Sequence, residues 1–192
     1  MANILFIDNI DSFTYNLVDQ LRVSKHNVII YRNYVPIQTI TRTIIKMKNP
    51  ILILSPGPGH PKDSGCILKL LLEFRGKIPI VGICLGHQAI VYAYSGEIGY
   101  ASTISHGKTS FINHDGKDMF ISISNPFIAA RYHSLICKKV PDQFVVNAHY
   151  NKMIMGIKNN NERICGFQFH PESILTTQGT KLLNQTLDWT IR

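Results

Sequence analysis

The sequence lacks any long hydrophobic run, and this absence limits where the protein can work. No segment reaches the roughly 18 apolar residues that a membrane-spanning helix needs. The opening stretch, MANILFIDNIDS, also lacks the basic region and apolar core of a secretory signal. We therefore expect a cytoplasmic protein.

Cysteine is scarce. The chain has four cysteines, at positions 66, 84, 137 and 165, and no Cys-x-x-Cys pair. In a cytoplasmic chain this wide spacing argues against both a disulfide framework and a zinc site. We therefore expect reduced thiols and no metal, and ask whether one of the cysteines is reactive.

Negative charge is also scarce, and nucleotide-binding motifs are missing. The net charge is +8, but the basic residues are scattered with no dense patch, so we expect no nucleic-acid partner. The charge indicates a solvated surface or a basic docking face. No G-x-G-x-x-G follows a predicted strand. HGKTS (106–110) ends like a phosphate-binding loop, but Ser102 stands where that loop needs glycine.

Strands alternate with helices in the first half of the chain. Each strand is a short apolar run, and each helix shows apolar residues at helical spacing. The order predicts a mostly parallel sheet with helices on both faces. The predicted strands are 3–8, 27–31, 51–54 and 78–83, and the predicted helices are 12–22 (capped by Ser12), 37–47 and 66–74. The stretch 86–96 is expected to start as a helix.

The second half is rich in short β segments separated by turns. We expect an antiparallel extension, a last sheet strand in ICGFQF (164–169) and a closing amphipathic helix in 176–191. With no linker or repeat, residues 1–192 are expected to form a single α/β domain.

Cys84 stands where a predicted strand meets a predicted helix, in GICLG (82–86). A strand that feeds directly into a helix must turn sharply, and small neighbours relieve the crowding, as in the G-x-S-x-G nucleophile elbow. The start of a helix also stabilises a thiolate, and the Leu85 N–H can stabilise an oxyanion. The alternative is a buried structural cysteine, which is the interpretation for the other three.

A thiol nucleophile needs a base, and GFQFHPES (166–173) offers one. His170 follows a predicted strand, and Glu172 is close enough to orient its ring. The alternative is a surface turn. LSPGPG (54–59) adds a loop, poor in side chains, at the same sheet edge, which can present N–H groups to a carbonyl oxygen or can be a simple turn.

Taken together, these stretches resemble the triad-type (class I) glutamine amidotransferases, and among them the glutaminase subunits of anthranilate synthases. DNIDSFTYNL, LSPGPG, GICLGHQAI, HGKTS, RYHSL and GFQFHPESILTTQG occur in family order across nearly the whole chain. The resemblance implies a flavodoxin-like domain with a Cys84, His170, Glu172 triad. It implies glutamine contacts at Gly57, Pro58, Gly59, Gln88, Ser134 and Leu135, with Gly57 and Leu85 at the oxyanion.

The resemblance also implies a partner. In the family, ammonia released from L-glutamine passes to a larger chorismate-aminating subunit that uses Mg²⁺, and we expect no cofactor in this chain. Three alternatives stay open: the corresponding subunit for 4-amino-4-deoxychorismate, a stand-alone γ-glutamyl cysteine hydrolase, and a non-enzymatic binding module. For DNIDSFTYNL two interpretations stay open: an N-cap network for the following helix, or support of the site or a subunit contact by Asn9 and Asp11.

Overall fold

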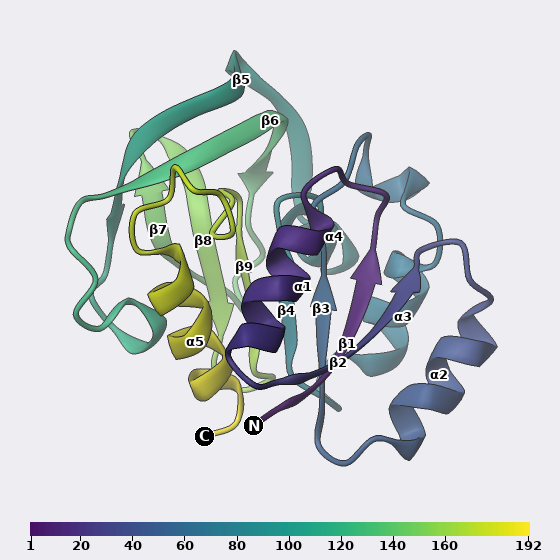
Figure 1. Cartoon of the computed structure of the whole chain (residues 1–192). Helices are drawn as coiled ribbons and strands as arrows, with labels where there is room; N and C mark the ends of the chain where they lie inside the picture. The colour runs from purple at the N-terminus through teal and green to yellow at the C-terminus, as the bar shows by residue number, and fades with distance from the viewer.

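The computed structural model describes residues 1–101 and 107–192, and within them the strands form one sheet with the order β2-β1-β3-β4-β9-β8-β7-β5-β6 (Figure 1). Pairing is parallel from β2 to β9 and antiparallel from β9 to β6. The strands are β1 (Asn3–Asp8), β2 (Asn27–Arg32), β3 (Pro50–Leu54), β4 (Ile80–Ile83), β5 (Glu97–His114), β6 (Phe127–Lys139), β7 (Val145–Tyr150), β8 (Met153–Asn159) and β9 (Ile164–Phe167).

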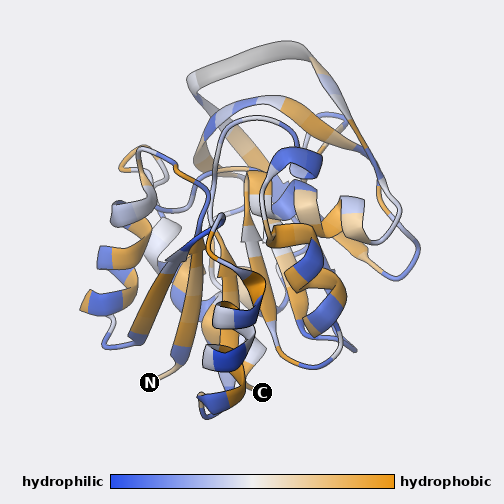
Figure 2. Cartoon of the chain, turned by 90° about the vertical axis from the view of Figure 1, so that its right-hand side faces the viewer, coloured by the Kyte–Doolittle hydropathy of each residue, from blue (hydrophilic) through white to orange (hydrophobic). Residues whose placement is uncertain are grey.

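Helices cover both faces of the parallel part of the sheet. They are α1 (Thr14–Val23), α2 (Ile37–Lys46), α3 (Ile67–Phe74), α4 (Leu85–Ala93) and α5 (Gly179–Thr190), with short 3₁₀ turns at Pro61–Asp63 and Asp118–Phe120. Successive residues of a strand point to opposite faces. Ile4 and Phe6 therefore join the core under α1 and α5, whereas Leu5 and Ile7 join the core under α2, α3 and α4. Figure 2 shows the resulting hydrophobic strands between helices whose outer faces are hydrophilic.

The carboxyl ends of the parallel strands point toward the antiparallel part of the molecule. In Figure 1 the arrowhead of β1 points upward, and the long β5–β6 ladder lies at the top of the molecule. Open parallel sheets bind ligands at this edge. The topology thus places the loops after β1, β3, β4 and β9 beside β6.

The predicted architecture, a mostly parallel α/β sheet with helices on both faces and an antiparallel extension, is confirmed. The stretch 86–96, which was expected to start as a helix, does so: α4 ends at Ala93, and Glu97 begins β5. One local prediction was wrong. Ser12 does not cap α1, whose N-cap residue is Phe13. The Asp8 carboxylate instead accepts the Ile10 N–H and the Thr14 hydroxyl, which delays the start of the helix.

Two further predictions concern a phosphate-binding loop and a membrane span. Residue 106 of HGKTS lies outside the described residues, as does residue 102, and 107–110 belong to β5, an antiparallel strand that is followed by the 3₁₀ turn Asp118–Phe120 and not by an α-helix. In the part of the chain that the structure describes, no helix is long and apolar enough to cross a membrane.

Candidate active site

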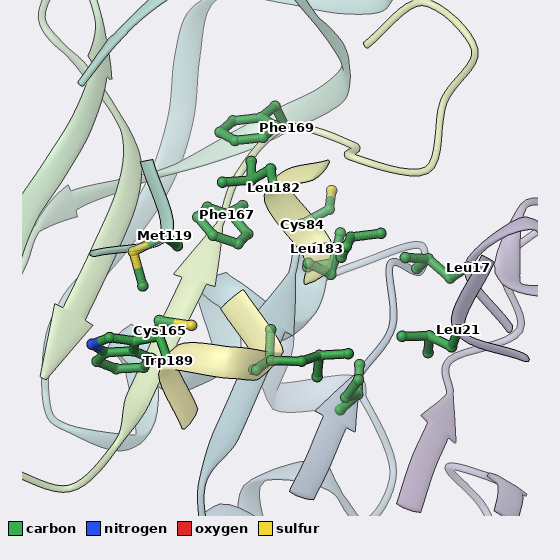
Figure 3. Close-up of a cluster of buried hydrophobic side chains, with 14 of the residues drawn as sticks. Leu17, Leu21, Cys84, Met119, Cys165, Phe167, Phe169, Leu182, Leu183 and Trp189 are labelled. Atoms are coloured by element: carbon green, nitrogen blue, oxygen red, sulfur yellow. The ribbon is translucent and has the colours of Figure 1, made fainter. Parts of the chain in front are cut away.

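Cys84 occupies the sharp turn between β4 and α4. Its backbone angles, φ 52° and ψ −100°, lie in a region that is strained for a residue with a side chain. The turn is held because the Cys84 N–H donates to the Phe167 carbonyl at 2.7 Å. The side chain is buried at the edge of the core cluster drawn in Figure 3. Strain of this kind is typical of functional positions.

The glycines on each side of Cys84 are required by close backbone packing. A Cβ atom on Gly82 would lie 2.5 Å from the Gly86 carbonyl, and one on Gly86 would lie 2.3 Å from the Leu54 carbonyl oxygen. The first turn of α4 therefore rests directly on β3 and β4. This contact explains why the motif has glycine at both positions.

His170 and Glu172 form a buried pair at the end of the strand next to β4. The Nδ1 atom of His170 lies 2.6 Å from Oε1 of Glu172. Among the described residues, Nε2 of His170 is buried and has no hydrogen-bond partner. Burial by itself would lower the pKa of His170, but the neighbouring Cys84 sulfur and the bond to Glu172 outweigh it and hold that pKa well above its ordinary value. The site therefore favours the protonated form of this ring.

The backbone around this pair is fixed from several elements. The His170 N–H donates to the Ala130 carbonyl, and the Thr176 hydroxyl donates to the His170 carbonyl at 2.6 Å. Gln20 of α1 donates to the Glu172 carbonyl at 3.2 Å. The ring of Tyr132 meets the His170 ring edge to face at 5.0 Å between centroids. The imidazole consequently has little freedom to rotate.

A cavity of about 110 Å³ opens in front of Cys84. It contains all six residues predicted to contact glutamine, and they come from three separate segments. Its lining is Gly57, Pro58, Gly59, Cys84, Gln88, Tyr132, His133, Ser134 and Leu135. A larger cavity, of about 590 Å³, adjoins His170 and Glu172 from the side of α1 but does not include Cys84. Only the smaller cavity brings a ligand to the thiol.

The loop after β3 is supported by the polar end of β1. Asn9 donates its backbone N–H to the Ser55 hydroxyl and its side-chain amide to the Ser55 carbonyl, both at 2.8 Å. A Cβ atom on Gly57 would lie 2.5 Å from that of Asn9, so only glycine allows this approach. Burial raises the pKa of Asp11, whose carboxylate accepts the Phe13 N–H. Asn9 therefore supports the loop, whereas Asp11 orders the turn that precedes α1.

Leu85, the other predicted oxyanion residue, is the first residue of α4. The first N–H groups of a helix have no partner within the helix. Its side chain also packs near Gly57, since a Cβ atom there would lie 2.9 Å from Leu85 Cδ2. Gly57 and Leu85, the two residues predicted to stabilise the oxyanion, thus lie together beside the turn at Cys84.

Sequence reasoning missed three buried polar side chains at this site. Gln168 donates to the Cys84 sulfur, His87 contacts the thiol of Cys137 at 3.3 Å, and His133 lines the cavity. A strand predicted to continue to Phe169 would have pointed to Gln168, which stands two residues before His170. The two histidines have no such signal, because eight histidines occur in the chain.

Both of these histidines are neutral near pH 7. Burial lowers the pKa of His87 to about 3, and burial together with the charge of Arg131 lowers the pKa of His133 to about 4. His170 differs from both, because its pKa is raised. Within residues 1–101 and 107–192, no group of three or more His, Cys, Asp or Glu side chains is arranged to hold a metal ion.

Comparisons with known proteins identify the family of the chain. The family model described as glutamine amidotransferase class-I matches residues 5–189. The chain is 61% identical over 189 residues to anthranilate synthase component 2 of Buchnera aphidicola from Schizaphis graminum, covering 98% of this chain and 96% of that protein. It is 51% identical to the protein of the same name from Haemophilus influenzae, over 98% of both chains.

Solved structures show the same fold at low identity. A putative GMP synthase protein from Thermoplasma acidophilum superposes with a TM-score of 0.86 at 20% identity, covering 100% of this chain and 94% of that one. A glutamine amidotransferase from Thermotoga maritima gives 0.73 at 14%, covering 100% and 98%. With a family match that spans nearly its whole length, the chain belongs to the class-I glutamine amidotransferases.

Proposed function

We propose that this chain is the glutaminase subunit of an anthranilate synthase. It hydrolyses L-glutamine and delivers the ammonia to a larger subunit that aminates chorismate. The observation that carries the chemistry is the strained Cys84 elbow beside a histidine whose second ring nitrogen is fixed by Glu172. The choice of synthase rests on relatives of 48–61% identity that are named anthranilate synthase component 2.

In the first half-reaction, the Cys84 thiolate attacks the carbon of the glutamine side-chain amide. An S–C bond forms, and the carbonyl electrons move to the oxygen, where N–H groups of Gly57 and Leu85 stabilise the negative charge. The C–N bond then breaks. His170 gives a proton from Nε2 to the departing nitrogen, so ammonia leaves and a glutamyl thioester remains.

In the second half-reaction, neutral His170 removes a proton from water as the water attacks the thioester. The C–S bond breaks, glutamate leaves, and the thiolate returns. Glu172 keeps Nδ1 protonated and directs Nε2 at the sulfur through both steps. The positive charge of His170 is therefore present when a thiolate must be stabilised and absent when a base is needed.

Glutamine binds in the cavity formed by 57–59, Gln88 and 134–135. These segments offer backbone polar groups with few charged side chains, which suits an amide substrate. Chorismate and the Mg²⁺ that its amination uses belong to the partner subunit, and the proposed chemistry of this chain needs no cofactor. The active complex is a hetero-oligomer that works in the cytoplasm.

Replacement of Cys84 by serine tests the proposal in the complex with a synthase subunit. We expect glutamine-dependent formation of anthranilate to be lost while ammonia-dependent formation persists. If the complex forms 4-amino-4-deoxychorismate in place of anthranilate, the chain belongs to the folate route. Rapid glutamine hydrolysis by the isolated chain, with no gain on adding a partner, would identify a stand-alone hydrolase.

A further inference from the structure

Two side chains of one extended segment reach Cys84. Phe167 and Phe169 point into the core cluster that Figure 3 draws, on one face of the segment. The side chains of Gln168 and His170 both come near Cys84 instead. Gln168 is fully buried, and its Nε2 donates to the Cys84 sulfur at 3.6 Å. The nucleophile thus has a second donor close by, in addition to the base.

The Gln168 amide belongs to a short chain of hydrogen bonds. Gln88 Nε2 donates both to the Leu135 carbonyl at 2.9 Å and to Gln168 Oε1 at 3.1 Å. The hydrogen-bond partners determine which way each amide points. The Leu135 carbonyl can only accept, which fixes the Gln88 nitrogen on that side. The same nitrogen also donates to Gln168, so the Gln168 atom that faces Gln88 must be the amide oxygen.

The consequence at the sulfur is a fixed polarity. With its oxygen committed to Gln88, Gln168 can present only N–H to Cys84. A hydrogen bond to the charged form of a group favours that form, and a buried donor has no competition from water. A flipped amide would place an oxygen lone pair against the sulfur and disfavour the thiolate. The Leu135 carbonyl therefore determines that Cys84 faces the N–H of the Gln168 amide and not its oxygen.

We propose that Gln168 belongs to the catalytic machinery: it donates an N–H to the Cys84 thiolate, in an orientation that the Leu135 carbonyl sets through Gln88. This inference rests on the proposed function of Cys84. It also gives Gln88 a task besides the predicted glutamine contact. Because Leu135 lines the same cavity, the chain of bonds joins the substrate pocket to the sulfur.

The test is the rate of Cys84 alkylation by iodoacetamide as a function of pH, on the full-length chain, with the labelled peptide located by mass spectrometry. Gln168→Met keeps the length of the side chain, removes the donor, and leaves Gln88 bonded to Leu135. We expect the midpoint of the profile to move up by about one pH unit, which slows labelling about tenfold below the midpoint. Gln185→Met is the control, because Gln185 donates only to backbone carbonyls of 119 and 121.

Gln88→Met provides a second test if Gln168→Met does not fold. It leaves the Gln168 amide free to turn, so we expect a smaller shift in the same direction. A profile that matches the wild type in a folded Gln168→Met protein, or in Gln88→Met, would overturn the inference while leaving Cys84 as the nucleophile. If wild-type Cys84 reacts no faster than Cys137 or Cys165, the proposed function itself fails, and the inference fails with it.

Discussion

Replacing Glu172 by glutamine removes one charge from the active site and little else. Glu172 Oε1 lies 2.6 Å from Nδ1 of His170, and both side chains are buried. Breaking a buried charged pair by neutralising one partner costs about 3–5 kcal/mol, since the other charge is left uncompensated. If about 3 kcal/mol of this is lost in the transition state, kcat for glutamine falls roughly 100-fold.

The assay compares glutamine-dependent and ammonia-dependent product formation in the complex with a synthase subunit. We expect kcat with glutamine to fall and its KM to change little, because Glu172 does not line the cavity in front of the thiol. Ammonia-dependent activity should stay unchanged. Glu162→Gln is the matched control, because Glu162 accepts from Tyr94 and Asn159 and does not contact the triad. Glutamine-dependent activity within about threefold of wild type would refute the assigned role of Glu172.

Three further predictions concern the elbow and the buried groups. Gly86→Ala places a Cβ atom 2.3 Å from the Leu54 carbonyl oxygen, so thermal unfolding should show a loss of about 3 kcal/mol or more, and an unchanged Tm would contradict the packing argument. The pKa of His133 is lowered from 6.5 to about 4 and that of His87 to about 3, so each ring is protonated in the unfolded chain at a higher pH than in the folded chain. Each should lower the free energy of unfolding by about 3 kcal/mol as pH drops from about 6.5 to about 4, and urea unfolding that is flat over this range would contradict it. Burial raises the pKa of Cys137 and Cys165, so neither should be alkylated in the folded chain near neutral pH, and labelling at the rate of an exposed thiol would show that the core opens.

Local patterns in the sequence predicted most of the parallel half of the fold. Each of its strands is a short apolar run bounded by turn residues, and β1 and β3 lie within a residue of their predicted limits. The start of β5 was missed, because Glu97 follows a helix and no alternating pattern marks it. The order of the strands could not be predicted from the sequence either, since β9 pairs with β4 across a long stretch of the chain.

The candidate site was predicted through its backbone motifs. Glycines around Cys84 and the turn after His170 carry local geometric signals, and family resemblance supplied the cavity residues. The hydrogen-bonded amides of Gln88 and Gln168 could not be predicted in the same way. They meet through a contact between α4 and the end of β9, which depends on tertiary packing.

The most direct test of the account is to trap the covalent intermediate. The complex is mixed with glutamine, quenched in acid within one turnover, and digested for peptide mass spectrometry. The account predicts a glutamyl adduct on the peptide that contains Cys84. Steady release of ammonia with no adduct at Cys84, or with the adduct on another residue, would contradict it.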